Sequence, residues 1–155
     1  MDMQLVQETA DRLAIMEMKA RFCRMSDILD VDGMLDVFTD DCEFVYTAGE
    51  PPARGKEALR AFYHSEVDLT VSCLHLVSNF EIEFVGPDLA NSRCALHSWK
   101  RFVNQPEDRR RYAQYIEQWR RTDAGWRQCR LEYVVVGENG TAEDRHGEQL
   151  TRPQA

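Results

Sequence analysis

The stretch that decides the fold runs Ser72-Cys-Leu-His-Leu-Val-Ser-Asn-Phe-Glu-Ile-Glu-Phe-Val85, and polar and apolar side chains alternate along most of it. Alternation with a period of two is typical of a β-strand that buries one face. The turn signal Gly86-Pro-Asp88 ends the stretch. Three later segments repeat the alternation, so the sequence predicts four successive strands, at residues 72–85, 91–103, 111–121 and 126–136.

Short connections join these predicted strands. The second connection, Asn104-Gln-Pro-Glu-Asp108, is a loose turn, and the third, Thr122-Asp-Ala-Gly125, is a tight turn of the hairpin type. Because parallel strands need long crossover connections, turns this short predict an antiparallel meander.

The first half of the chain has helical patterning instead. Residues 4–29 are predicted as a long helix, and its inward stripe is expected at Leu13, Met16, Ala20, Cys23 and Asp27. After it we expect a short helix from Val31 or Asp32 to Phe38 with Asp30 as its N-cap, a strand at Cys42–Tyr46, and a third helix at Gly55–Ser65. Helices that precede one strongly curved sheet predict an α+β fold.

The composition predicts one folded domain. The chain has 155 residues, 43% of them hydrophobic, and its formal net charge is −8. This balance does not suit nucleic acid or an anionic membrane, which both need a basic surface, and it favours a small neutral ligand or a protein partner. No apolar run is long enough to span a membrane, and Asp2 and Gln4 stand where a signal peptide would be basic and then apolar. We therefore expect a cytoplasmic protein with a domain at residues 1–137 and a polar tail at 138–155.

Neither a metal nor a cofactor is expected. The five cysteines, at positions 23, 42, 73, 94 and 129, are odd in number, form no C-x-x-C pair and stand among apolar neighbours, as free buried thiols do. His75 and His97 are not at a local ligand spacing. The sequence also has no nucleotide-binding glycine motif, P-loop, nucleophile elbow or H-E-x-x-H motif.

Asp27 and His75 are the candidate catalytic pair. Asp27 falls on the expected inward stripe, where a carboxylate must be paired or lie in a wet cavity; alternatively, the helix ends earlier and Asp27 points outward. A histidine near a carboxylate forms the usual general-base pair. Simple alternation puts His75 on the same face as Glu81 and Glu83, toward solvent. An inward His75 therefore requires a bulge near Ser78-Asn79, or a change in what covers the strand.

Three other polar positions have two interpretations each. The ring of Tyr46 is expected to be buried, and its hydroxyl either donates to a substrate carbonyl or bonds a backbone group. His97 is either a pocket residue or a hydrogen-bonded core histidine. The cluster Arg109-Arg-Arg111 is expected to be a solvated strand edge rather than a phosphate site, because the chain is acidic.

Several segments resemble the SnoaL-like branch of the nuclear transport factor 2-like superfamily, over about residues 8–136. The matching segments are Ile15–Asp27, Asp32–Asp41, Arg54–Leu59, His75–Asn79 and Gly125-Trp126. Within this branch the chain is similar to scytalone dehydratase, bile acid 7α-dehydratase and lindane dehydrochlorinase. The resemblance implies a cone-shaped α+β barrel, in which a strongly curved antiparallel sheet and three N-terminal helices enclose an apolar pocket.

The resemblance also implies roles for six residues. In those lyases an Asp at the end of the first helix and a His on the first long strand form a proton-abstracting dyad, and Asp27 and His75 occupy these positions. Tyr46 and His97 are similar in position to pocket residues of scytalone dehydratase. The remaining substrate-binding candidates are Asn79, which matches a recurrent Asn after the His, and Arg121, which resembles an Arg of lindane dehydrochlorinase.

The activity implied is that of a cofactor-independent lyase of the dehydratase type, or an isomerase, acting on a hydrophobic, carbonyl-bearing ring compound such as a polyketide or steroid. His75 would remove a proton, Asp27 would balance the imidazolium, and Tyr46 with His97 would stabilise the enolate. The alternatives are a non-catalytic small-molecule-binding or assembly subunit, and a polyketide cyclase or epoxide hydrolase of the same fold. The expected partners are a small hydrophobic substrate and further copies of the chain, in a dimer or trimer, without nucleic acid or membrane.

Overall fold

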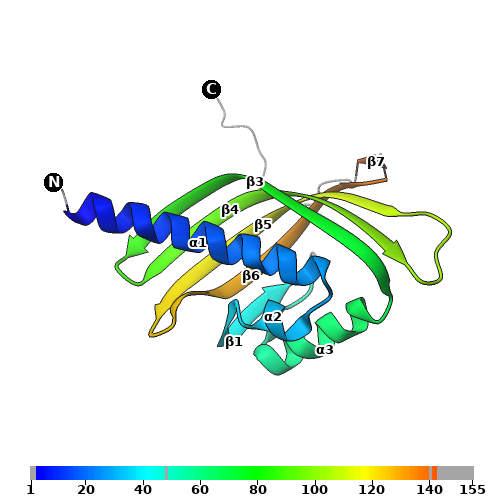
Figure 1. Cartoon of the computed structure of the whole chain (residues 1–155), viewed down its shortest axis with the longest axis horizontal. Helices are drawn as coiled ribbons and strands as arrows, with labels where there is room; N and C mark the ends of the chain where they lie inside the picture. Colours follow the sequence, from blue (N-terminus) through cyan, green and yellow to red (C-terminus); the bar gives the residue numbers. More distant parts are fainter. Residues whose placement is uncertain (1–2, 48, 140, 143–155) are drawn as a thin grey trace.

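The computed structural model describes residues 3–47, 49–139 and 141–142, with three helices up to Val67 and four long strands after it (Figure 1). The helices are α1 (Met3–Asp27), α2 (Val31–Leu35) and α3 (Lys56–Val67). The strands are β1 (Phe38–Val45), β2 (Ala53–Arg54), β3 (Thr70–Gly86), β4 (Leu89–Phe102), β5 (Arg109–Thr122), β6 (Gly125–Glu138) and β7 (Thr141–Ala142).

One curved sheet contains all the described strands. Its order is β2-β1-β6-β5-β4-β3, with β7 paired to β6. Strands β3 to β6 form the predicted antiparallel meander, whereas β1 runs parallel to β6, with Phe44 opposite Leu131. Helix α1 lies along one face of the sheet, and α2 and α3 lie beside β1 (Figure 1). The predicted α+β fold is confirmed, and the described strands curve without closing into a complete barrel.

A short turn brings α2 back against the end of α1. The predicted N-cap is confirmed, because the Asp30 carboxylate accepts a hydrogen bond from the backbone N–H of Gly33 at 2.9 Å. A Cβ atom at Gly33 would lie only 2.5 Å from the sulfur of Met25, so glycine permits this close packing. Helix α2 ends at Leu35, before the predicted Phe38, which is already the first residue of β1.

The predicted inward stripe of α1 is wrong at three of its five positions. Leu13 is 57% exposed, Met16 is 37% exposed and Ala20 is also exposed. The face against the sheet instead carries Asp11, Ile15, Lys19, Phe22 and Cys23. Two of these inward residues are charged, and apolar periodicity therefore pointed to the wrong side of the helix.

The charged residues of this face are paired inside the protein. The Lys19 ammonium lies 2.6 Å from a carboxylate oxygen of Glu117 on β5, and neither side chain has any exposed area. Glu117 also accepts hydrogen bonds from Ser92 and Gln128, at 2.7 and 3.0 Å. The Lys19 ammonium is 3.4 Å from the centre of the Tyr115 ring, a cation–π contact. These contacts compensate for the removal of both charges from water.

A second ion pair holds the N-terminal half of α1. Arg121 on β5 donates two hydrogen bonds to the Asp11 carboxylate, at 2.9 and 2.6 Å, and the Trp126 indole N–H donates a third at 3.0 Å. The Arg121 guanidinium holds the pKa of Asp11 below its usual value. Because Arg121 belongs to β5 and Trp126 to β6, their hydrogen bonds to Asp11 hold the N-terminal half of α1 against these two strands.

The five cysteines are buried and free, as predicted. Among the described helices, none combines the length and apolar character that a membrane span requires. The tail predicted at residues 138–155 lies mostly outside the described residues; within them, Glu138 ends β6 and residues 141–142 form β7.

Replacing Lys19 with methionine should lower the free energy of unfolding by about 3–5 kcal/mol, because Glu117 would be left as a buried carboxylate without its cation. The double variant Lys19→Met/Glu117→Gln should recover part of the loss, since neither charge remains. Urea denaturation followed by circular dichroism measures both values.

Arg54→Met provides the matched control, because it removes a cation from the surface pair with Glu43, whose N–O distance is 2.8 Å. The Arg54 side chain is 74% exposed, so we expect a loss of no more than about 1 kcal/mol. Equal losses for Lys19→Met and Arg54→Met would contradict the structural role given to the buried pair.

Candidate active site

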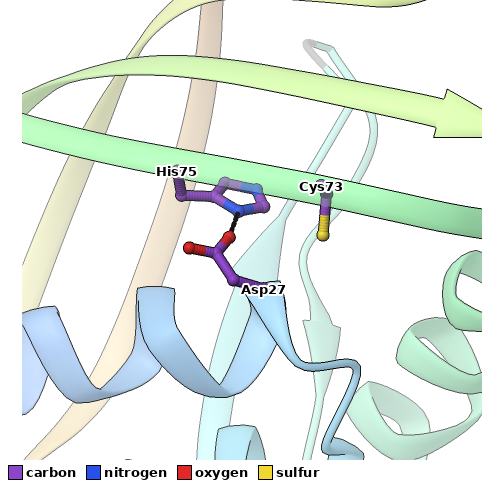
Figure 2. A group of neighbouring side chains, drawn as sticks. All are labelled: Asp27, Cys73 and His75. Atoms are coloured by element: carbon purple, nitrogen blue, oxygen red, sulfur yellow. Dashed lines mark hydrogen bonds and ion pairs between the residues drawn. The ribbon is translucent and has the colours of Figure 1, made fainter.

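Asp27 and His75 meet where the last turn of α1 reaches β3. The Nδ1 atom of His75 lies 2.7 Å from Oδ1 of Asp27 (Figure 2). The His75 side chain is 7% exposed and that of Asp27 is 20% exposed. In a neutral imidazole this contact places the proton on Nδ1 and leaves the lone pair on Nε2. No described residue gives Nε2 a hydrogen bond, so it is the nitrogen that can accept a proton from a bound molecule.

A bulge in β3 turns His75 inward. The pairing of β3 with β4 shifts register between Ser78 and Glu81, and Asn79 has a left-handed backbone with a φ of 54°. Before the bulge Cys73, His75 and Val77 are the more buried residues, and after it they are Phe80, Ile82 and Phe84. The irregularity that an inward His75 requires is therefore present, and simple alternation assigned His75 to the wrong face.

His75 lines a cavity of about 280 Å³ between the sheet and the helices. Its wall combines polar and charged side chains with five aromatic ones, Tyr46, Phe62, Tyr63, Tyr115 and Tyr133. The hydroxyl groups of Tyr46 and Tyr63 lie 2.6 Å apart, and the Tyr46 ring stacks on Phe62 with 4.4 Å between ring centres. Tyr46 is thus a cavity residue, in agreement with what the resemblance implies, with a second tyrosine hydroxyl beside its own.

The surroundings set the protonation states of these groups. Burial lowers the pKa of His75 below its ordinary value of 6.5; the Asp27 hydrogen bond opposes this shift, and the positive charge of Lys100 adds to it. His75 is therefore mainly neutral at pH 7. Burial raises the pKa of Tyr46 far above 10, so its hydroxyl stays protonated and can donate a hydrogen bond.

Three cations that were not predicted as site residues line the same cavity. They are Lys100 on β4 and Arg109 and Arg111 on β5, accompanied by the carboxylate of Glu66 on α3. Arg110, between the two arginines, is exposed. The prediction of a solvated strand edge is therefore wrong, because β5 lies between β4 and β6 and only Arg110 is exposed. The side chains of Arg109 and Arg111 are only 20% and 27% exposed.

Three predicted substrate-binding residues lie elsewhere. His97 is exposed on the other face of β4 and stacks on the Tyr112 ring, with 4.6 Å between ring centres. Asn79 is exposed at the bulge and shapes the strand. Arg121 is engaged by Asp11 and lies over the Trp126 ring, so its role is to hold α1. None of the three borders the cavity.

One group of described residues could hold a metal ion. Ligand atoms of Asp27, Cys73 and His75 all lie within 4.8 Å of one another (Figure 2). The Cys73 thiol, however, donates a hydrogen bond to the backbone oxygen of Ser26 at 3.3 Å, and burial raises its pKa. Metals bind the thiolate form of cysteine, whereas these surroundings keep Cys73 as a protonated thiol. Cys73 is therefore poorly suited to be a metal ligand. The set of groups fits acid–base chemistry better: a neutral imidazole backed by a carboxylate, beside tyrosine hydroxyl donors.

Solved structures of other proteins share this fold. One is a "Putative Scytalone Dehydratase" from Novosphingobium aromaticivorans DSM 12444, with a TM-score of 0.82 at 22% identity. The superposition with it covers 95% of this chain and 97% of that protein's chain. A "putative aromatic ring hydroxylase" from Novosphingobium aromaticivorans has a TM-score of 0.79 at 26% identity, with coverage of 86% and 94%. Hexachlorocyclohexane dehydrochlorinase LinA-type3 from Novosphingobium barchaimii LL02 has a TM-score of 0.76 at 19% identity, with coverage of 90% and 97%. A search of curated proteins finds no match.

The family assignment comes from the sequence itself. Residues 7–132 match the SnoaL-like domain family. The matched stretch runs from α1 into β6, so it contains Asp27, His75 and most of the cavity wall. The chain belongs to the SnoaL-like domain family.

Proposed function

We propose that the protein is a lyase of the dehydratase type, or an isomerase, which removes a proton next to the carbonyl group of a small ring compound without a cofactor. The observation that carries the proposal is the hydrogen bond between Asp27 and His75 at the wall of an aromatic cavity. Membership of the SnoaL-like family and the shared fold of dehydratase and dehydrochlorinase structures support it.

His75 is the general base of this mechanism. Its Nε2 atom takes the proton from the carbon next to the carbonyl group, and the electron pair of that C–H bond moves onto the carbonyl oxygen as an enolate. The resulting imidazolium donates its Nδ1–H to the Asp27 carboxylate, which stabilises the positive charge and keeps the ring oriented.

Tyr46 is the proposed donor to the enolate oxygen. Its hydroxyl is protonated and paired with that of Tyr63, so a second hydroxyl supports the donor. A hydrogen bond at the oxygen where negative charge develops lowers the barrier to proton removal. If the neighbouring carbon carries a hydroxyl group, the enolate collapses, and hydroxide leaves with the proton from His75 as water. If a double bond is conjugated with the enolate instead, return of the proton from His75 to the far carbon of that system gives an isomer.

Replacing His75 with glutamine or Asp27 with asparagine should lower the rate by roughly 10²–10⁴-fold, the usual contribution of a general acid–base group. Two probes test this: loss of water from 3-hydroxy-1-tetralone, read as 1-naphthol fluorescence, and exchange of the α-hydrogens of 1-tetralone for deuterium, read by mass spectrometry. His97→Gln is the matched control, because His97 is exposed on the adjacent strand. Retained activity in His75→Gln, or a wild-type rate no faster than buffer with both probes, would contradict the proposal.

The pH dependence of kcat/KM should show the low pKa of the base. Protonation of Nε2 removes its lone pair, so the rate falls as the pH falls, and we expect the midpoint below pH 6.5. Lys100→Met should move this midpoint upward, because the Lys100 charge lowers the pKa of His75. Arg110→Gln removes an exposed charge from β5 and should leave the midpoint in place. An acid limb centred above pH 6.5 in the wild-type protein would argue against His75 as the base.

A further inference from the structure

The charge of the cavity is opposite to that of the protein. Four residues that line it carry a charge, namely Glu66, Lys100, Arg109 and Arg111. Three of these charges are positive and one is negative, whereas the whole chain has a formal net charge of −8. Since His75 is mainly neutral, the cavity presents an excess of positive charge to whatever enters it.

The protein's own carboxylates leave part of the hydrogen-bonding capacity of these cations unoccupied. Glu66 lies 3.3 Å from the Lys100 ammonium and 3.8 Å from the Arg109 guanidinium, so one carboxylate is shared between two cations. Glu138 accepts a hydrogen bond from Nε of Arg111 at 2.7 Å, and the hydroxyl of Tyr133 is a second hydrogen-bond partner of this guanidinium. No described residue accepts a hydrogen bond from the Arg109 guanidinium, although its side chain is only 20% exposed.

Arg109 is also placed so that a ligand can reach it. Its guanidinium lies over the Phe102 ring, 4.4 Å from the ring centre, and a guanidinium that stacks on a ring can still donate hydrogen bonds in its own plane. Burial and the neighbouring charge of Arg111 lower the pKa of Arg109, which is the expected effect of two cations held close together in partly dry surroundings. An anion between the two guanidinium groups would relieve this repulsion.

The sheet register relates these cations to the proposed base. His75 is opposite Ser98, and Ser98 is opposite Arg111, so the three residues form one row across β3, β4 and β5. The next row on the same face of the sheet contains Cys73, Lys100 and Arg109. Neighbouring strands are about 4.8 Å apart, so the backbones of His75 and Arg111 are roughly 10 Å apart. A ring compound spans such a distance with its reacting carbon at His75 and a substituent at the arginines.

We infer that the substrate carries a carboxylate group, which Arg109 and Arg111 bind while the ring lies against the tyrosines. The planar guanidinium forks match the two oxygens of a carboxylate, and such charge-assisted hydrogen bonds are among the stronger polar contacts in proteins. This inference names the substrate class for the proposed function and rests on it. It narrows the expected neutral, hydrophobic ring compound to one with a negatively charged end.

Binding of unreactive ligands tests the inference without depending on catalysis. Isothermal titration calorimetry compares 2-naphthoate with the neutral 2-naphthamide, which has nearly the same shape. We expect the amide to bind about 10- to 100-fold more weakly, the range for losing a hydrogen bond to a charged group. Equal binding of the two ligands would overturn the inference.

Variants of β5 identify the residues responsible. Arg109→Gln and Arg111→Gln should each weaken naphthoate binding by about 10- to 100-fold and leave naphthamide binding unchanged. Arg109→Lys keeps the charge but loses the fork, and should give an intermediate loss. Arg110→Gln is the matched control, with the same change at an exposed neighbour, and should have no effect. A loss that is equal for both ligands, or equal for Arg110→Gln, would contradict the assignment.

The two proposals fail in distinguishable ways. If His75→Gln retains the dehydratase and exchange activities while naphthoate is still preferred over naphthamide, the proposed function fails and the carboxylate site stands. If His75→Gln abolishes activity while the acid and the amide bind equally, the function stands and the carboxylate site fails.

Discussion

The buried ion pair between Lys19 and Glu117 fixes α1 on the sheet, and the position of Asp27 depends on it. Two charges removed from water are stable only when their geometry is maintained, so the helix cannot slide or rotate freely. A shift of one residue along α1 would rotate its side chains by about 100° and break the pair. The Asp11–Arg121 pair adds a second fixed point. The last turn of the helix therefore delivers Asp27 to His75 on β3, and the candidate site follows from contacts far from it.

Much of the fold could be predicted because its strands carry a simple signal. Alternation and turn residues located β3 to β6, and the short turns required an antiparallel arrangement. The buried face of α1 could not be found in the same way. Lys19 and Asp11 have the composition of an exposed face, and only their partners on β5, about a hundred residues away, make burial favourable. Pairing over such a distance leaves no periodic trace in the sequence.

The candidate site was only partly predictable for a related reason. Asp27, His75 and Tyr46 are brought to the site region, but His75 faces the cavity only because the bulge at Asn79 reverses the alternation of β3. Arg109 and Arg111 share the parity of the buried Tyr115, a signal in the sequence that could have placed them inside. The acidic net charge argued for a solvated edge instead. Net charge describes the whole surface, and a cavity can have the opposite sign.

Coupling between Asp27 and His75 is the central claim, and an NMR pH titration of the His75 ring tests it most directly. The ring resonance is assigned by its loss in His75→Gln, and the wild-type protein is compared with Asp27→Asn. Because the Asp27 hydrogen bond favours the imidazolium and burial opposes it, the account predicts a midpoint below pH 6.5 that falls further when Asp27 loses its charge. A midpoint above pH 6.5, or one that Asp27→Asn leaves unchanged, would contradict the account.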